Sequence, residues 1–334
     1  MPYRMRSVIL GSFGRPAEVL TLGKRPVPEP GAGQVRVRMT MSPIHNHDIA
    51  IVRGVYGQQP PLPAVPGTEA AGVVDALGAG VDGFAVGQRV TLGGGSGTWA
   101  DYFLAPAAVL VPVPDAMSDE LACQLVSMPL SAMALLEDLQ VQPGQWMVQN
   151  AANGAVGKTV AMLAAGRGIK VVNLVRRDAG IAELADVGIT AVVSTEHDGW
   201  PDRVRELTGD DPIVCAVDSV GGPAADDLLD LVADKGLLMS FGAMVGHSLE
   251  ISVANLLFKQ TTVRGFWLAK RLQETSADDT ARMIGELIQL ALSGALRLPV
   301  EATYDLADAP AAIAASAVPG RRGKVVLTSA GALG

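Results

Sequence analysis

A glycine pattern between two apolar segments constrains the fold of this chain more than any other feature. The segment 150-NAANGAVGKTV-160 carries Ala151, Gly154 and Gly157 in the spacing AxxGxxG, after a strand-like run and before a helical one. Small residues at such a junction let the backbone approach a pyrophosphate, whose charge is stabilised at the positive end of a helix. The pattern and its context predict a dinucleotide-binding βαβ unit.

Two other interpretations of these glycines remain open at this level. Gly157-Lys158-Thr159 resembles the end of a phosphate-binding P-loop, but that motif requires glycine where the chain has Ala152. Alternatively, the glycines would serve only the close packing of a helix on a strand. A second strand ending near Val175 supplies the context that the dinucleotide motif requires, and therefore favours it.

The end of that second strand indicates which nicotinamide cofactor is bound. A site for NAD would place Asp or Glu there, to bond the ribose 2′-hydroxyl. The chain has Arg176 and Arg177 instead, and Asp178 comes one residue late. The planar fork of arginine donates two hydrogen bonds to a phosphate at once, which favours NADPH through its 2′-phosphate. A solvated pair of surface arginines is the alternative.

Patterns of strand and helix divide the chain into parts of different character. Residues 1–120 contain alternating apolar runs, such as 35–41 and 70–78, between Gly and Pro clusters, which predicts an irregular β domain. Within 121–270, apolar strands alternate with helices, which predicts an α/β fold with a doubly wound parallel sheet. We expect its strands at 146–150, 170–175, 191–193, 213–218, 236–242 and 261–267.

The remaining segments complete this organisation. A helical pattern over 119–139 leads into the second domain, with an expected break at Pro129. After it, an amphipathic helix near 277–294 and a strand at 324–329 belong to a C-terminal segment, 271–334, which we expect to return to the first domain.

Composition excludes several classes of protein. Of 334 residues, 49% are hydrophobic and 18% charged, which suits a large core and argues against disorder. The net charge of −8, with no Lys/Arg run longer than two, argues against a nucleic-acid partner. The longest apolar stretches are broken by charges well short of the roughly 18 to 20 residues that cross a membrane. Cys123 and Cys215 form no CxxC pair, so we expect buried thiols and a cytoplasmic protein.

Neither a metal nor a nucleophile is predicted. Zinc-dependent alcohol dehydrogenases share the general layout, but the chain has Thr68 where a histidine ligand would fall and no cysteine in the loop 42–50. His45 and His47 form an HxH pair without a third ligand nearby, so we expect them to be polar loop residues. Ser96 lacks the second glycine of a GxSxG motif, since position 98 is Thr98. Hydride transfer, in which the cofactor carries the chemistry, remains.

The whole chain resembles the zinc-free medium-chain dehydrogenase/reductase superfamily, within it the 2-enoyl thioester reductases, and next the quinone oxidoreductases. The matching segments lie in both predicted domains and are 53-RGVYG-57, 66-PGTEAAG-72, 128-MPLSAM-133, 150-NAANGAVG-157, 174-LVRRD-178, 241-FGAMVG-246 and 257-LFKQTTVRGFWL-268. The resemblance implies a GroES-like, β-rich catalytic domain joined to a Rossmann domain. It also implies a homodimer.

The resemblance assigns roles to individual residues. Tyr56 matches the active-site tyrosine of the family, and Trp267 lines the site beside the nicotinamide and the acyl chain. The implied cofactor contacts are Asn153, Gly154, Ala155, Val156 and Gly157 at the pyrophosphate, Arg176, Arg177 and Asp178 at the 2′-phosphate, and Phe241, Gly242, Ala243, Met244, Phe266, Trp267 and Leu268 at the nicotinamide. Lys324 matches a C-terminal lysine near the cofactor.

The activity implied is NADPH-dependent reduction of the C2–C3 double bond of trans-2-enoyl thioesters, carried on coenzyme A or acyl carrier protein. Three departures from the family pattern bear on it: Met128 replaces an asparagine, Ser131 replaces a threonine, and His47 replaces a small residue. Two alternatives stay open. One is a quinone or enone oxidoreductase on the same scaffold, and the other is a non-catalytic NADPH-binding protein.

Overall fold

The computed structural model describes residues 3–209, 211–245 and 248–329, which form two compact units. The first unit comprises the chain up to Ser127 and again from Leu298, and the second runs from Met128 to Arg297. The sequence predicts limits near residues 120 and 270. The second boundary lies at Arg297 instead. The amphipathic helix α11 (Ala277–Leu292), expected in the segment 271–334 that returns to the first domain, therefore belongs to the second unit, whereas the strands that follow it lie in the first.

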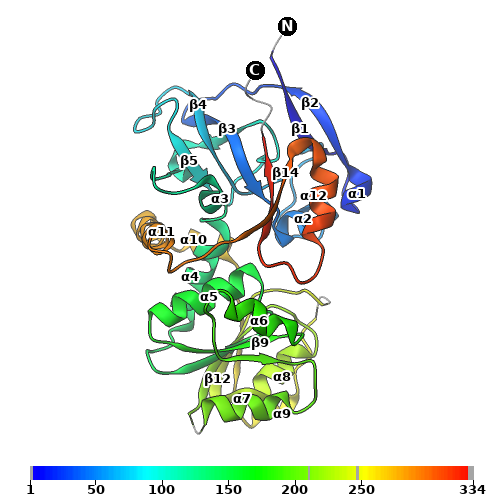
Figure 1. Cartoon of the computed structure of the whole chain (residues 1–334), viewed down its shortest axis with the longest axis vertical. Coiled ribbons are helices and arrows are strands. Elements are labelled where there is room, and N and C mark those ends of the chain that lie inside the picture. The colour runs from blue at the N-terminus through cyan, green and yellow to red at the C-terminus, as the bar shows by residue number, and fades with distance from the viewer. Residues whose placement is uncertain (1–2, 210, 246–247, 330–334) are drawn as a thin grey trace. The chain divides into compact units, whose positions relative to one another are not determined.

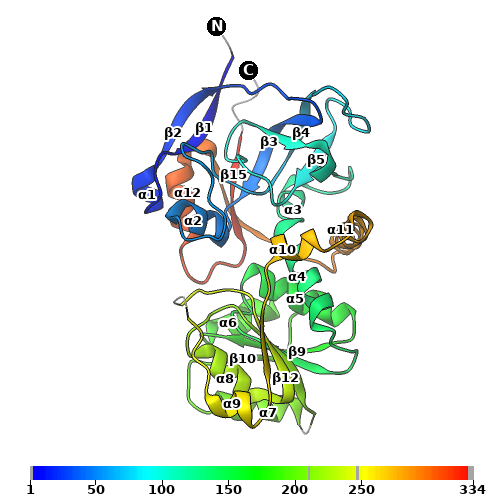
Figure 2. The same cartoon turned by 180° about the vertical axis from the view of Figure 1, so that it is seen from behind.

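The first unit is built on β-sheet. Its seven-stranded sheet has the order β14-β15-β3-β4-β5-β7, with β6 paired to β3, and β1 and β2 form a separate ribbon. Figure 2 shows the C-terminal strand β15 beside the N-terminal strand β3, with which it pairs antiparallel. The strands are β1 (Arg4–Leu10), β2 (Leu20–Pro26), β3 (Gln34–Pro43), β4 (Ala70–Leu77), β5 (Arg89–Leu92), β6 (Tyr102–Pro106), β7 (Val111–Pro112), β14 (Val300–Asp305) and β15 (Lys324–Thr328).

Short helices lie between the strands of this unit. They are α1 (Pro16–Val19), α2 (Asn46–Arg53), η1 (Ala107–Val109), α3 (Asp119–Ala122), η2 (Leu306–Asp308) and α12 (Ala309–Ser316). The core between them contains the alternating inward side chains of β3, Val35, Val37 and Met39, all fully buried, together with Trp99. The period of two in 35–41 therefore matches a sheet with one buried face.

The second unit has the α/β fold that the sequence predicts. Its six-stranded parallel sheet has the order β10-β9-β8-β11-β12-β13. Its strands are β8 (Trp146–Gln149), β9 (Lys170–Val175), β10 (Val192–Ser194), β11 (Ile213–Asp218), β12 (Val232–Ser240) and β13 (Thr262–Gly265), and each overlaps an expected strand. The chain winds outward from β8 to β10 and then returns to β11 on the other side of β8. Ligands of such sheets bind at this reversal, outside the carboxyl ends of the strands.

Helices cover both faces of this sheet. Figure 1 shows α5 and α6 on the near side, and Figure 2 shows α8 and α9 on the other. The helices are α4 (Ser127–Leu139), α5 (Ala155–Gly166), α6 (Ala179–Ala185), α7 (Trp200–Thr208), α8 (Ala224–Leu231), α9 (Val253–Leu257), α10 (Leu268–Gln273) and α11. In the described residues no helix is long and apolar enough to cross a membrane.

The expected break at Pro129 is wrong. The helical segment 119–139 breaks between Ala122 and Ser127 instead, and α4 continues through Pro129. Pro129 lies in the first turn of α4, where an N–H has no intrahelical partner to lose, so proline is tolerated there.

Candidate active site

Buried hydrogen bonds join the carboxyl ends of β8 and β11 at the point where the sheet reverses. Asn150 Nδ2 donates to Asp218 Oδ1 at 2.6 Å, and the backbone N–H of Ser219 donates to Asn150 Oδ1 at 2.7 Å. Asp218 also accepts the backbone N–H groups of Val220 and Gly221 at 3.0 and 3.1 Å. These hydrogen bonds hold the amide of Asn150 and the carboxyl of Asp218 in defined orientations at the point where the sheet reverses.

The glycine motif forms the turn from β8 into α5. Gly154 is the N-cap of the helix, and its own position supplies no side chain to cap the first turn. A Cβ on Gly157 would lie 2.7 Å from both Cα and carbonyl O of Ala152, so this glycine permits close packing of helix on turn. The first N–H groups of α5, from Ala155 onward, point out of the helix without intrahelical partners. This turn fits the pyrophosphate of a dinucleotide.

Two exposed arginines follow β9. Among the described residues, neither Arg176 nor Arg177 has a hydrogen bond or ion pair from its guanidinium to another side chain, so both are available to an incoming anion. The carboxyl of Asp178, the next residue, interacts with other side chains of the protein. The hydroxyl of Ser194 and then the ring of His197, 3.2 Å away, lower the pKa of its exposed carboxyl. The site therefore fits a 2′-phosphate.

The ends of β12 and β13 bring together the segments around Phe241 and Phe266. The backbone N–H of Phe241 donates to Asp218 O at 2.7 Å, and that of Phe266 donates to Ser240 O at 2.9 Å. The two rings stack with centroids 5.8 Å apart. Gly242 follows closely, since a Cβ there would lie 2.9 Å from Ser219 O, and Met244 is 65% exposed. These predicted contact residues thus share the carboxyl edge of the sheet with the glycine turn.

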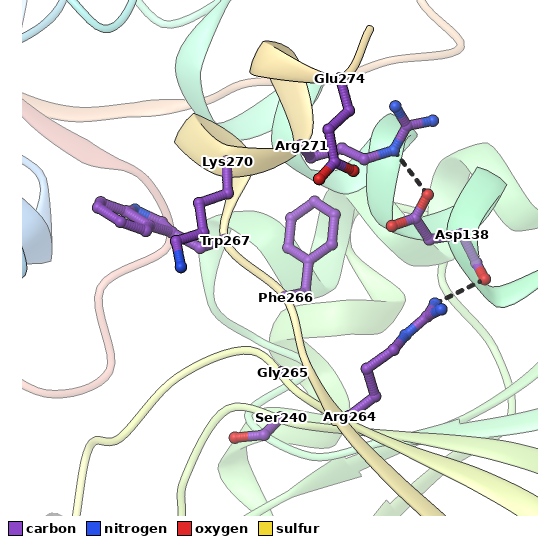
Figure 3. A pocket seen from close by; sticks show the side chains of 9 residues that line it. All are labelled: Asp138, Ser240, Arg264, Gly265, Phe266, Trp267, Lys270, Arg271 and Glu274. Carbon is purple, nitrogen blue, oxygen red and sulfur yellow. Dashed lines mark hydrogen bonds and ion pairs between the residues drawn. The ribbon is translucent and has the colours of Figure 1, made fainter.

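A pocket of about 470 Å³ lies beside Phe266 in the second unit. In Figure 3 the ring of Phe266 points towards Arg271 and Glu274, whereas the indole of Trp267 points away from them. Arg271 forms an ion pair with Asp138 at 2.7 Å, and Arg264 donates to the carbonyl of Asp138 at 3.1 Å. Trp267 is the N-cap of α10, so Leu268 begins that helix.

In the first unit, a buried histidine–carboxylate pair lies under the start of α2. His45 Nε2 and Glu69 Oε2 are 2.6 Å apart, and neither side chain is exposed. The other oxygen of Glu69 accepts the backbone N–H groups of Val126 and Ser127 at 2.8 and 2.7 Å. Three hydrogen bonds therefore hold this carboxyl in one orientation.

Around this pair the pKa values are displaced by burial. Loss of hydration raises the pKa of Glu69 to about 7 and lowers that of His45 well below its ordinary value. Loss of hydration also lowers the pKa of Lys324, on β15, to about 8, although the carboxyls of Asp48 and Glu69 oppose that shift. His45 is therefore neutral at physiological pH and shares a hydrogen bond with Glu69 through Nε2, whereas its Nδ1 is buried without a partner in the described structure.

A second chain of hydrogen bonds leads outward from the same helix. His47 Nε2 lies 2.6 Å from Thr68 Oγ1, and Thr68 Oγ1 donates to Asp48 Oδ1 at 2.7 Å. The ring of His47 stacks on that of His45 with centroids 4.9 Å apart. Its centroid also lies 5.8 Å from the ring of Tyr56, tilted by 34°.

Tyr56 is half-buried and stands just past the end of α2. Gly54 ends the helix at φ +77°, a conformation that L side chains rarely adopt, and a Cβ there would lie 2.9 Å from Phe13. The carbonyl of Tyr56 accepts the side-chain amide of Gln59 at 2.8 Å. The glycine therefore fixes the direction of the chain on which Tyr56 is carried.

The expectation that His45 and His47 are polar loop residues is wrong. His45 is a fully buried N-cap and His47 belongs to α2. Sequence reasoning also missed Glu69, although one charge inside the small, apolar run 66–72 indicates a buried carboxyl. Lys324, expected near the cofactor, lies in the first unit within the electrostatic reach of His45, Asp48 and Glu69.

A catalytic zinc does not fit this cluster. His45 Nε2 is occupied by Glu69, and the neighbouring ligand position holds the hydroxyl of Thr68. Within residues 3–209, 211–245 and 248–329, three groups able to hold a metal come together only at Asp178, Glu196 and His197, all exposed. Exposed acidic groups of this kind are common without a metal.

Comparison with known proteins identifies the family. Residues 31–115 match the alcohol dehydrogenase GroES-like domain and residues 155–285 match the domain described as zinc-binding dehydrogenase. The chain is 32% identical to the mitochondrial enoyl-[acyl-carrier-protein] reductase of Homo sapiens, over 98% of this chain and 89% of that protein.

Solved structures agree with this relationship. A Bacillus thuringiensis protein assigned as an NADPH:quinone reductase superposes with a TM-score of 0.91 at 30% identity, covering 98% of this chain and 99% of the other. The Escherichia coli quinone oxidoreductase complexed with NADPH gives 0.88 at 25% identity, over 97% and 99%. These matches bear out the fold and the resemblance that the sequence predicts. The chain is an oxidoreductase of the zinc-free medium-chain dehydrogenase/reductase superfamily, related to the enoyl reductases and next to the quinone oxidoreductases.

Proposed function

We propose that this enzyme uses NADPH to reduce the C2–C3 double bond of trans-2-enoyl thioesters, carried on coenzyme A or acyl carrier protein. The observation that carries the proposal is the phenol of Tyr56. Tyr56 follows the glycine that ends α2, and its ring lies beside that of His47, which belongs to the cluster of buried histidine and carboxyl side chains. The enoyl-[acyl-carrier-protein] reductases to which the chain is related along nearly its whole length support the substrate class.

The chain's own groups would hold NADPH at the carboxyl ends of β8 and β9. The turn Asn153–Gly157 suits the pyrophosphate, and Arg176 and Arg177 would donate to the 2′-phosphate. Asp178 lies beside them, and Lys324 remains a proposed contact. The segments Phe241–Met244 and Phe266–Leu268 would enclose the nicotinamide in largely apolar surface and exclude water. When bound, the cofactor supplies a hydride to the β-carbon of the substrate.

Tyr56 acts on the charge that this hydride creates. As the β-carbon is reduced, negative charge develops on the thioester oxygen and the α-carbon. A hydroxyl that donates to this charge lowers the barrier, by about 3 to 4 kcal/mol where such donors have been removed from other enzymes. The hydroxyl carries a proton, so Tyr56 can also deliver a proton to the α-carbon. Trp267 would position the acyl chain for both events.

Tyr56→Phe tests the assignment, because it removes only the hydroxyl. We expect kcat for crotonyl-CoA with NADPH to fall by a factor of about 100 or more, whereas the exposed control Tyr3→Phe leaves it unchanged. Steady-state kinetics with enoyl-CoA substrates of several lengths and with quinones, each with NADPH and NADH, give the measurement. If Tyr56→Phe keeps activity within about tenfold, or 1.4 kcal/mol, the catalytic assignment is wrong.

Reduction of quinones or enones is the second candidate. The high structural similarity to quinone reductases favours it. Turnover of quinones that exceeds that of enoyl thioesters, and that does not need Tyr56, would support this alternative. NADPH binding without turnover of either class of substrate would indicate a non-catalytic protein. This third candidate rests on Met128, which replaces the asparagine of the family pattern.

We also propose that the enzyme is a homodimer. The outer strand β13 leaves one edge of the parallel sheet unpaired within the described residues, and such edges invite a further strand. Phe258 and Leu257, on the adjacent segment, are 82% and 63% exposed, which supports a buried interface there. A cytoplasmic location stays a prediction, because the mitochondrial location belongs to the named relatives.

A further inference from the structure

The hydroxyl of Thr68 fixes the proton arrangement around His47. A threonine hydroxyl has one proton, and Thr68 Oγ1 donates it to Asp48 Oδ1 at 2.7 Å. The same oxygen can then only accept from His47 Nε2, 2.6 Å away. Asp48 is itself held, because its other oxygen accepts the backbone N–H of His45 at 2.9 Å. In the neutral ring of His47, Nε2 therefore carries the hydrogen and Nδ1 is the acceptor.

The position of His47 places this defined ring between a buried group and the phenol. One face stacks on His45, at a centroid distance of 4.9 Å and an angle of 16°. The ring of Tyr56 lies 5.8 Å away. The side chain of His47 is 21% exposed, so it reaches solvent protons that His45, fully buried, does not. His47 is thus the histidine that can connect Tyr56 with water.

We propose that His47 is a positioning residue that resupplies the proton of Tyr56, an inference that rests on the proposed reductase activity. In each turnover the Tyr56 O–H bond breaks as a C–H bond forms at the α-carbon. The phenolate then takes the proton from Nδ1 of protonated His47, directly or through one water. His47 regains a proton from solvent. One solvent proton and one hydride from NADPH are thereby added across the double bond.

Charged groups lie around His47. Asp48 Oδ1 is 3.7 Å from His47 Nε2, and the carboxyl of Glu69 also interacts with the ring of His47. Lys324, on β15, interacts with both of these carboxyls. His45 does not repel a charged His47 ring, because burial keeps His45 neutral. Since the relay passes a proton through His47 in each turnover, we expect the pH profile of kcat to change when this ring is removed.

His47→Gln is the conservative test, since the amide can still donate to Thr68 but cannot supply a proton. We expect kcat for crotonyl-CoA reduction to fall about 100-fold, with the KM for NADPH within about twofold and one limb of the pH profile lost. Asn46→Gln, exposed on the same helical turn, is the matched control. In His47→Ala, imidazole added to the assay should restore kcat. Among substituted imidazoles, those whose pKa lies nearest the assay pH should restore it most.

The outcomes separate this inference from the activity on which it rests. A wild-type enzyme that reduces no enoyl thioester overturns the proposed function. An active wild-type enzyme whose His47→Gln variant keeps the same kcat and pH profile overturns the relay alone. Loss of activity in His47→Ala without rescue by imidazole, while circular dichroism shows a folded chain, also overturns it, because His47 then serves packing only.

Discussion

Glu69 predicts an unusual dependence of stability on pH, which Glu69→Gln can isolate. The carboxyl is fully buried and its pKa is raised from 4.5 to about 7. The folded chain therefore keeps a proton on Glu69 over a range in which the unfolded chain has released it. Stability from this group is fully present below pH 4.5 and is lost as the pH rises through about 7. The difference corresponds to about 3 kcal/mol.

The glutamine variant keeps the shape but does not titrate. Its carbonyl oxygen can still accept the N–H groups of Val126 and Ser127. Its amide nitrogen would donate to His45 Nε2, as protonated Glu69 does, so the imidazole carries its proton on Nδ1 and this arrangement does not change with pH while the ring is neutral. The advantage of the wild type over Glu69→Gln should therefore shrink by about 3 kcal/mol between about pH 5 and pH 8.

Native-state hydrogen exchange measures this for the first unit alone. Peptides from β3 and β4, read by mass spectrometry, give the free energy of opening of the sheet, and comparison at equal pH cancels the intrinsic exchange rate. Glu206→Gln, at an exposed position, is the control. A wild-type advantage that stays constant within about 1 kcal/mol across this range would refute the reasoning, because Glu69 would then be ionised in the fold throughout.

Two further predictions concern the second unit and the thiols. Replacing both Arg176 and Arg177 by Ala should raise the KM for NADPH about 100-fold, through loss of charge-assisted hydrogen bonds, and leave the KM for NADH unchanged; equal effects on both cofactors would contradict the 2′-phosphate site. Burial raises the pKa of Cys215 to about 12 and that of Cys123 well above its ordinary value. Iodoacetamide should therefore label neither thiol at pH 8 before denaturant is added, and mass spectrometry of the native enzyme would disprove this by finding either adduct.

The fold of the second unit could be predicted because its signals are local. The glycines of the turn, the strand before them and the helix after them lie within one short segment, and the arginines follow at the end of the next strand. The six strands of the parallel sheet are short apolar runs that need no distant partner to be noticed.

The histidine cluster could not be predicted in the same way. His45 and Glu69 are brought together by the pairing of β3 with β4, and Lys324 arrives through β15. No local pattern records those pairings. The residues next to His45 and His47 in the sequence therefore suggest a polar loop, although the tertiary structure buries the ring of His45 completely. The helix break expected at Pro129 is wrong for a local reason: proline breaks a helix in its interior, but Pro129 lies in the first turn of α4, where proline is tolerated.

The discontinuous first unit has a consequence for synthesis on the ribosome. The second unit is one continuous stretch, Met128 to Arg297, so all of its strands are synthesised before β14 and β15. In the first unit, the end of β3 at Met41–Pro43 stays without its antiparallel partner until β15 is made. The parallel sheet of the second unit can thus form while the cluster around Glu69 in the first unit still lacks Lys324. A chain released before β15 would carry the complete parallel sheet of the second unit and an unfinished sheet in the first.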